Sequence, residues 1–341
     1  MISLSPTDLA LASALVALDA GVSIALKLQL HRQLLWAASR MVVQLIAVGF
    51  ILRFIFALNN PLATLAIVLV MGAIAAREIA ARPVRKFKGL AGLLVAADAG
   101  VSIAFKLNLH RQLLWAATRM VIQLVAVGFI LRFIFGLNHP AATLGIVLAM
   151  SAIAAREVAA RPVRGFKGWA GLAISGATVA LATLVTAILA LTTAIRPHPW
   201  YDPRYAISLV GIILGSVLNA GSLTLDGIVG GVWRERTAIE AQLALGVDFR
   251  AATRPLQREA IRRGLLPIVN QMSAAGLITL PGIMTGQIIA GMDPVEAVKY
   301  QILLMFLLAG ASGVAALTIA DLALRRLTDG RERLRLDRLK S

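Results

Sequence analysis

Long apolar segments follow one another along the whole chain, and this feature restricts the possible folds more than any other. They lie at about residues 8–27, 35–57, 61–80, 90–108, 114–136, 140–159, 169–195, 205–225, 265–291 and 300–324. Several of them reach the roughly 20 residues that a helix needs to cross the hydrocarbon core of a bilayer. Only 15% of the 341 residues are charged, too few to cover the surface of a soluble protein of this length. The sequence therefore predicts an all-α polytopic bundle, an integral membrane protein with about nine to ten apolar segments.

The chain has a net charge of +17, and its basic residues lie mainly in short loops between the apolar segments and in the tail at 325–341. Loops rich in Lys and Arg stay in the cytoplasm and thereby set the orientation of a membrane protein. This placement accounts for the charge without nucleic acid, which we do not expect as a partner. We expect a multi-pass protein of the cell inner membrane, surrounded by lipid, with a cytoplasmic C-terminus.

The N-terminal half contains a close internal repeat. Residues 19–93 align with 98–172 at a constant offset of 79, and only 14 of the 75 aligned pairs differ. Repeats built into whole transporter folds are normally faint in sequence, so this similarity indicates a late tandem duplication of three apolar segments. We divide the chain into a first copy at 1–89, a second copy at 90–168 and a C-terminal core at 169–341. The second copy either has a function of its own or is a tolerated insertion.

The repeat conflicts with a simple topology. Three spanning helices are an odd number, so the second copy would be inverted, yet both copies carry the same basic loops. The conflict disappears if segment 90–108 lies at the interface or re-enters, since it is short and contains Asp98 near its middle. A charged aspartate at mid-membrane costs about 2.5–3.5 kcal/mol on insertion scales. We expect nine spans and one interfacial helix, with ten spans as the alternative.

No sequence signature of an enzyme is present. The chain lacks the G-x-x-x-x-G-K-[ST] loop that holds nucleotide phosphates, so any ATP would be bound by a separate subunit. It has no cysteine, which excludes disulfides and thiolate metal sites, and its four histidines are not clustered in sequence. We therefore expect no catalytic residue and no cofactor bound by this chain.

One long polar interval, residues 226–264, interrupts the apolar pattern. Arginine and glutamate alternate there with apolar residues such as Ile239 and Leu243 at helical spacing. The sequence predicts an amphipathic helix, a turn at 246–248 and a second helix, continuous with the flanking spans. A solvated basic loop is the simpler alternative, but a long loop with helical periodicity more often binds a partner. An ATPase subunit on the cytoplasmic side would be a natural partner.

Proline and glycine are dense in the stretch 265–302. The run from Thr279 to Gly286 would break or kink a membrane helix, and irregular backbone at membrane depth is tolerated only where protein or a water-filled cavity covers it. Broken helices of this kind contact the substrates of transporters. The candidate pathway residues in this stretch are Asn270, Pro281, Gly282, Met284 and Gly286.

Three methionines of the same stretch, Met272, Met284 and Met292, carry thioethers that could contact a soft metal ion. Methionine is more often used to fill gaps in an apolar core. We therefore favour packing over metal binding for all three side chains.

A polar pair enters the second apolar segment of each copy. Arg40 and Gln44 lie four residues apart, hence on one helix face, and Arg119 and Gln123 repeat them. The arginine could reach the cytoplasmic headgroups while the glutamine bonds a neighbouring helix. The alternative is a polar patch that faces a translocation pathway.

The stretch that begins at Pro267 resembles the FetB-type ABC transporter permeases, described as iron exporters in bacteria, with plant relatives linked to aluminium tolerance. The matching motif is Pro267-Ile268-Val269-Asn270, then Gly276-Leu277-Ile278-Thr279-Leu280-Pro281-Gly282-Ile283-Met284-Thr285-Gly286, followed by Ala290-Gly291-Met292-Asp293-Pro294 and Lys299-Tyr300-Gln301-Ile302. A second match, Arg40-x-x-x-Gln44-Leu45, resembles the second helix of the family. The resemblance covers nearly the whole chain once and leaves one copy of the repeat without a counterpart.

The resemblance implies a permease subunit that forms a homodimer, pairs with two ATPase subunits and exports metal ion, with iron as the suggested substrate. Glu240 and Ala241 with Gly246 look like the start of the loop that docks the ATPase. The second copy adjoins the C-terminal core directly, so we expect 98–172 to occupy the position of the family's own segments. This choice puts Arg119 and Gln123 in the pathway.

The residues alone leave two other functions open. Asp19 and Asp98 lie within apolar segments and would suit a secondary transporter driven by an ion gradient. A membrane scaffold without transport activity is the third possibility.

Overall fold

The computed structural model describes residues 6–58, 109–137, 139–191, 202–276 and 280–340. Its helices are α1 (Pro6–Ala25), α2 (His31–Leu58), α5 (Leu109–Leu137), α6 (Pro140–Ala160), α7 (Ala170–Leu189), α8 (Pro203–Arg234), α9 (Arg236–Ala244), α10 (Phe249–Ala274), α11 (Gly282–Ile289) and α12 (Pro294–Arg326). Within these ranges no strand occurs, and seven helices are long and apolar enough to cross a membrane. The prediction of an all-α polytopic membrane protein is confirmed.

Two of the expected apolar segments, 61–80 and 90–108, lie outside the described residues. The choice between nine and ten spans, the interfacial placement of 90–108 and the role of Asp98 therefore stay predictions. The expected segment 265–291 is divided between the end of α10 and the short helix α11, which confirms the predicted break.

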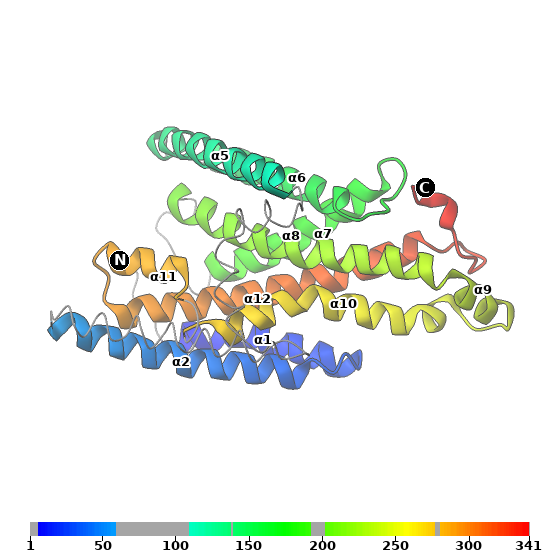
Figure 1. Cartoon of the computed structure of the whole chain (residues 1–341), viewed down its shortest axis with the longest axis horizontal. Coiled ribbons are helices and arrows are strands. Elements are labelled where there is room, and N and C mark those ends of the chain that lie inside the picture. The colour runs from blue at the N-terminus through cyan, green and yellow to red at the C-terminus, as the bar shows by residue number, and fades with distance from the viewer. Residues whose placement is uncertain (1–5, 59–108, 138, 192–201, 277–279, 341) are drawn as a thin grey trace.

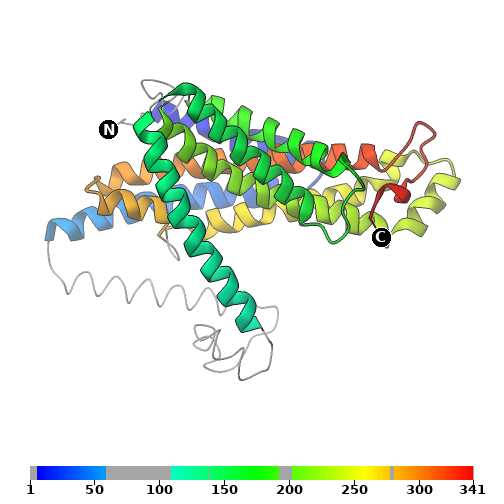
Figure 2. The same ribbon diagram turned by 90° about the horizontal axis from the view of Figure 1, so that it is seen from above.

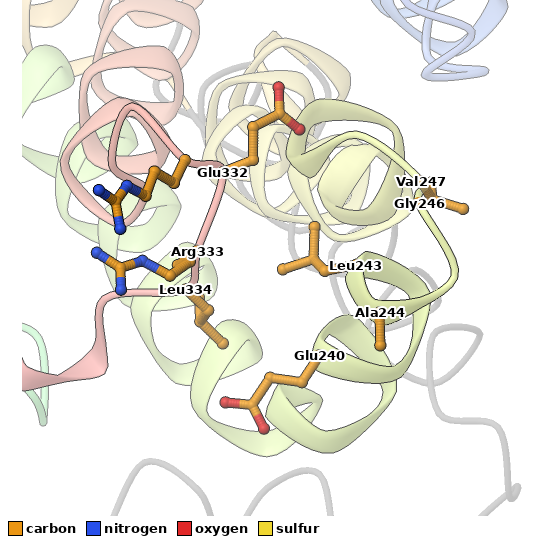
Figure 3. A pocket seen from close by; sticks show the side chains of 9 residues that line it. Glu240, Leu243, Ala244, Gly246, Val247, Glu332, Arg333 and Leu334 are labelled. Carbon is orange, nitrogen blue, oxygen red and sulfur yellow. The ribbon is translucent and has the colours of Figure 1, made fainter.

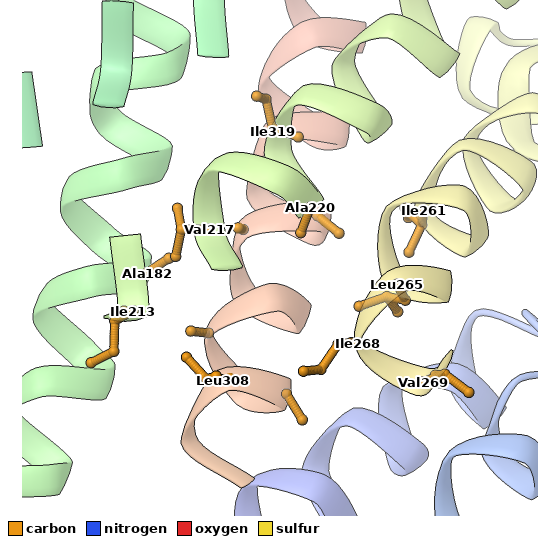
Figure 4. Close-up of a cluster of buried hydrophobic side chains, with 14 of the residues drawn as sticks. Ala182, Ile213, Val217, Ala220, Ile261, Leu265, Ile268, Val269, Leu308 and Ile319 are labelled. Carbon is orange, nitrogen blue, oxygen red and sulfur yellow. The ribbon is translucent and has the colours of Figure 1, made fainter. Parts of the chain in front are cut away.

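Helix α12 forms the axis of the bundle. In Figure 1, α10 and α12 run between α1 and α2 on one side and α6, α7 and α8 on the other. Figure 4 shows the core where α7, α8, α10 and α12 meet through aliphatic side chains such as Val217, Leu265 and Ile319. Residues 309–316 of α12 are all Ala, Gly, Ser or Val. Small residues let neighbouring backbones approach closely, which is how membrane helices associate without a hydrophobic driving force between them.

Short sequence signals fix the starts of the long helices. Asp202 and Asp293 each precede a proline at the first helical position. Their carboxylates accept hydrogen bonds from the backbone N–H groups of Arg204 and Val295, both at 2.9 Å. Aspartate at the N-cap suits a helix start because its carboxylate accepts from a backbone N–H that has no partner within the helix. Proline suits the next position because it has no backbone N–H to satisfy.

The two copies of the repeat lie in different surroundings. Helix α2 packs against α1, α10 and α12, whereas α5 has only sparse contacts with α6 and α8. Figure 2 shows α5 crossing the other helices and extending past their edge. We expected the second copy, 98–172, to occupy the family's position in the core. Instead both copies contribute: α1 and α2 of the first copy and α6 of the second copy pack on the bundle. Since α2 and α5 differ at only four of 28 aligned positions, the helix sequences themselves do not decide between them.

Matched residues of the two helices show the difference directly. Met41 and Leu45 of α2 are fully buried, while their counterparts Met120 and Leu124 of α5 are 53% and 63% exposed. A Cβ atom at Gly49 would lie 2.8 Å from Cγ2 of Val298 on α12, but one at the matching Gly128 would meet nothing within 4 Å.

Disulfide cross-linking can verify this assignment, because the chain has no native cysteine. We expect the pair Gly49→Cys and Val298→Cys to oxidise readily, since their Cβ atoms would lie within the roughly 3.5–4.5 Å that a disulfide needs. The matched pair Gly128→Cys and Val298→Cys should stay reduced. Protection from a maleimide of high mass measures both. A bond between positions 128 and 298, with none between 49 and 298, would contradict the packing of α2.

Asp19 lies on the buried face of α1 and contacts α12. Its side chain is 6% exposed, and its carboxylate lies directly against Gly313. A Cβ atom at position 313 would overlap Asp19 Oδ1 and lie 2.6 Å from the carboxyl carbon. The glycine is therefore required by the close approach of the two helices.

Replacing Gly313 by alanine should destabilise the protein by about 1–3 kcal/mol, because an overpacked core must shift side chains or backbone. The Gly21→Ala variant is a matched control on α1, since a Cβ atom there meets nothing within 4 Å. Alanine also favours a helix over glycine by up to about 1 kcal/mol, so the control should be neutral or slightly stabilised. Thermal unfolding in detergent measures both. Equal losses in the two variants would refute the close contact with Asp19, and adding Asp19→Ala should reduce the loss caused by Gly313→Ala.

Candidate functional site

A helical hairpin forms one end of the molecule. Helix α8 continues to Arg234, α9 follows after a single residue, and the chain turns at Gly246, whose φ is +85°. Asp248 caps α10 by accepting a hydrogen bond from the N–H of Ala251 at 3.2 Å. The predicted helix, turn and second helix are thus confirmed, and both arms are continuous with the long helices of the bundle.

The hairpin has one buried face, which packs against the bundle, and one face that is exposed. Ile239 and Phe249 are 2% and 3% exposed and join the main core. The outer surface of α9 and the turn is exposed, including Glu240, Ala241 and Gly246, the three predicted docking residues. Leu245 is 84% exposed, an unusual position for leucine outside the apolar spans. The structure therefore brings the three residues together on one accessible surface.

A pocket of about 510 Å³ separates this hairpin from the C-terminal tail. Figure 3 shows it from close by, with the hairpin on one side and the tail on the other. Its lining combines apolar and charged side chains: Glu240, Leu243, Ala244, Gly246, Val247, Arg331, Glu332, Arg333 and Leu334.

The tail, residues 327–340, has its own hydrogen-bonded fold. The carboxylate of Asp329 accepts hydrogen bonds from the backbone N–H groups of Arg331 and Arg333, each at 3.0 Å. The backbone N–H of Arg333, followed by its guanidinium, lowers the pKa of Asp329 to about 2. Arg335 binds Asp337 through two hydrogen bonds of 2.8 Å. Several arginines that suggested only membrane orientation therefore hold the tail in shape.

The tail connects two parts of the bundle. At one end the Glu332 carboxylate accepts a hydrogen bond from the backbone N–H of Phe249, at 2.8 Å, and so helps to cap α10. At the other end it pairs with the loop between α6 and α7: the N–H of Lys167 donates to the carbonyl of Arg338, and the N–H of Lys340 donates to the carbonyl of Gly165, both at 2.8 Å. The sequence contained no strong signal for this strap, because its short polar turns resemble those of a solvated tail.

The apolar part of the bundle contains a polar groove of about 230 Å³ between α8, α10 and α12. Ser216 and Ser312 share a hydrogen bond of 2.7 Å there, and Asn219 and Gln271 line the groove with exposed amides. Pro267 also lines it and removes the backbone N–H that would pair with the carbonyl one turn earlier. Sequence reasoning missed these residues, although Ser216 and Asn219 stand three apart in an otherwise apolar run, hence on one helix face.

The predicted pathway residues of the proline-rich stretch do not gather in this groove. Asn270 is exposed on α10 beside Gln271, whereas Gly282, Met284 and Gly286 belong to α11 and Pro281 directly precedes it. Helix α11 lies at the opposite end of the bundle from the hairpin (Figures 1 and 2). Their role in a pathway stays a prediction.

The polar pair of the first copy lies at the break between α10 and α11. With its amide oriented to satisfy both groups, Gln44 donates to the carbonyl of Ala275 at 3.0 Å and accepts from Arg40 Nε at 2.6 Å. Gly276, with φ of +89°, packs against the backbone of Gln44. Arg119 and Gln123, the pair chosen from sequence, are instead exposed on α5. Gln44 therefore satisfies backbone that the broken helix leaves free.

The methionines lie within the packed interior. Met272 and Met284 are fully buried and Met292 is partly buried, each against the apolar core. In the described ranges no group of three His, Asp or Glu side chains is arranged to hold a metal ion. This burial suits the packing that we favoured for the methionines, and metal binding by them remains the untested alternative.

Substituting Glu332 by alanine should loosen the hairpin, because the N–H of Phe249 loses its partner. Loss of a capping carboxylate costs about 0.5–2 kcal/mol, so amide exchange at residues 247–251 should accelerate several-fold. The control is Glu259→Ala, which removes an exposed ion pair with Arg263 worth at most about 1 kcal/mol. Hydrogen–deuterium exchange mass spectrometry measures both variants. Unchanged exchange at 247–251 in the Glu332→Ala protein would show that the tail does not hold the hairpin.

Comparison with known proteins identifies relatives for most of the chain. The profile of the Uncharacterised protein family UPF0014 matches twice, over residues 6–92 and 88–328. The chain is 36% identical over 231 residues to the UPF0014 membrane protein slr1647 of Synechocystis, covering 67% of this chain and 87% of the relative. It is 33% identical over 254 residues to the "Probable iron export permease protein FetB" of Escherichia coli, covering 74% and 95%.

A plant relative is also similar. The UPF0014 membrane protein STAR2 of rice is 33% identical over 224 residues, which cover 66% of this chain and 76% of the relative. No solved structure matches the chain.

Proposed function

This chain belongs to the UPF0014 family, and from that premise we propose that it is the membrane-spanning permease subunit of an ABC transporter. In this proposal a separate cytoplasmic subunit binds and hydrolyses ATP, and this chain has no enzymatic activity of its own. The hairpin and the tail lie at the same end of the molecule (Figure 1), and the proposal assigns this end to the cytoplasmic side of a cell inner membrane.

The observation that carries the proposal is the continuity between the hairpin and the groove. Helix α8 runs without interruption from Ser216 and Asn219 in the groove to Arg234 at the hairpin. Helix α10 likewise extends from the turn to Gln271. A partner that moves the hairpin would therefore act on two walls of the groove, since both helices continue from the hairpin into the groove.

Helices α8 and α10, which carry the two sides of the hairpin, pack closely against each other. This close packing supports their movement as a unit. A Cβ atom at Gly264 of α10 would overlap Thr224 Oγ1 and lie 2.8 Å from the carbonyl of Ala220. A Cβ atom at Gly227 of α8 would lie 3.0 Å from Cβ of Ala260. Close glycine contacts of this kind bring membrane helices into van der Waals contact along their backbones.

The open groove supports a homodimer. Asn219 and Gln271 are exposed in the groove, and Asn219 has one side-chain hydrogen bond there, which its Oδ1 accepts from the Arg161 guanidinium at 3.5 Å. Amide groups within a bilayer need hydrogen-bond partners, because unsatisfied ones cost several kcal/mol. A second copy placed over the groove would supply partners and enclose a polar pathway between the two subunits.

The substrate proposed is a metal ion, moved outward. This choice rests on the name of the Escherichia coli relative, which describes iron export. Serine and amide oxygens of the groove are ligands that suit a hard cation in transit. Asn270, Pro281, Gly282, Met284 and Gly286 would line the part of the route farther from the hairpin.

A secondary transporter driven by an ion gradient is the second candidate. Asp19 favours it, because this carboxylate is buried in a membrane helix and its Oδ2 has no hydrogen-bond partner among the residues that the structure describes. Such residues often handle protons or ions. This alternative needs no ATPase subunit, and it requires Asp19 or Asp98 for transport.

Reversing one charge on the hairpin tests the permease proposal. The Glu240→Arg variant should capture the proposed ATPase subunit at least about tenfold less well, since unfavourable charge at an interface costs more than about 1.4 kcal/mol. Glu240 is exposed, so folding should be unchanged. Pull-down from detergent and ATP-dependent metal transport in vesicles measure the effect.

The control for this experiment is Arg204→Glu, an exposed charge reversal at the start of α8, far from the hairpin. It should leave capture unchanged. Full capture by the Glu240→Arg protein would show that the hairpin is not the docking surface. Transport by this chain alone, abolished by Asp19→Asn together with Asp98→Asn, would establish the gradient-driven alternative instead.

A further inference from the structure

Two distant parts of the chain form the walls of the pocket in Figure 3. One wall is the end of α9 and its turn, with Leu243 and Glu240; the other is the tail, with Leu334 and Arg331. Leu243 and Leu334 are both partly buried and pack against the main core. The apolar floor therefore belongs equally to the hairpin and to the tail.

Some charged side chains at the rim of the pocket already form hydrogen bonds or ion pairs within the chain, and others do not. Arg333 forms an ion pair with Asp329 at 2.9 Å, and Glu332 accepts from the N–H of Phe249. Arg331 uses only its backbone N–H, toward Asp329, and its exposed side chain forms no hydrogen bond or ion pair with any residue that the structure describes. The exposed carboxylate of Glu240 is equally unengaged within those residues. One cationic and one anionic group are thus available on opposite walls.

We propose that the C-terminal tail is the second half of the docking site for the ATPase subunit. This inference rests on the proposed function and assigns the pocket to one segment of that partner. The segment would place an apolar side chain on Leu243 and Leu334, an acidic group beside Arg331 and a basic group beside Glu240.

Hydrogen bonds hold the tail beside the turn of the hairpin. Glu332 is bonded to the first residue of α10, so the tail stays within contact distance of any partner that covers the turn. The pairing of Lys167 and Lys340 with their partners holds the other end of the tail against the loop between α6 and α7. A partner bound to both walls would therefore also act on α6 and α7, in addition to α8 and α10.

The mixture of charges selects the kind of partner. Acidic and basic groups are equally numerous at the rim, with two carboxylates from Glu240 and Glu332 and two guanidiniums from Arg331 and Arg333. An anionic lipid headgroup or a free phosphate would meet repulsion as well as attraction there. A protein surface can match both signs, and such complementarity gives an interface its specificity.

The experiment reverses the charge on the tail while leaving the hairpin intact. Arg331→Glu should reduce capture of the ATPase subunit about tenfold, whereas Arg331→Lys, which keeps the charge, should retain most of it. The matched control is Arg326→Glu, the same change on an exposed arginine that does not line this pocket. Point variants are preferable to truncation, because removing residues 330–341 would also remove the bond from Glu332 to α10.

The outcomes separate this inference from the proposed function. If the unmodified chain captures no ATPase subunit, the proposed function fails. If Glu240→Arg abolishes capture while Arg331→Glu has no effect, the hairpin docks alone and the role of the tail is refuted. A fall in capture with Arg331→Glu, at unchanged unfolding temperature and unchanged binding to vesicles of anionic lipid, establishes the tail as part of the interface. A change in vesicle binding alone would assign Arg331 to the membrane surface and overturn the inference.

Discussion

The bundle depends on how closely its helices approach α12. Helices in a bilayer gain little from burying apolar side chains, because lipid is equally apolar, so van der Waals contact and a few polar bonds hold them together. The run of small residues at 309–316 provides that contact on several sides at once. Helix α1 approaches so closely at Gly313 that the carboxylate of Asp19 fills the space of a side chain. The groove follows from the same packing, since Ser312 in this run faces Ser216 of α8.

The second constraint is that backbone polar groups at membrane depth need partners. The break between α10 and α11 interrupts the regular hydrogen bonds of a helix. The side chain of Gln44 provides a replacement by donating a hydrogen bond to the carbonyl of Ala275. A polar residue of the first copy thus stabilises an irregular segment of the C-terminal core. This contact connects the first copy of the repeat to the proline- and glycine-rich stretch of the C-terminal core.

Much of the fold could be predicted from the sequence where local signals are strong. Apolar length identified the seven described spans, helical spacing identified the hairpin, and proline with glycine identified the break after α10. The occupancy of the core by the two copies could not be predicted, because α2 and α5 are nearly identical and only their surroundings differ. The groove and the strap were also missed, since Asn219 and Gln271 converge only in three dimensions and the tail depends on backbone bonds to distant loops.

The unequal surroundings of α2 and α5 have an evolutionary consequence. Gly49 is confined by Val298, and Met41 and Leu45 are confined by the core, so most substitutions there carry a packing penalty. Their counterparts on α5 need only remain apolar enough for a bilayer. Under this arrangement α5 can accumulate substitutions that would destabilise the packing of α2. A duplication still so nearly identical is therefore young relative to the rate at which lipid-facing residues drift, and α5 is the part of the chain with the most freedom to acquire a new role.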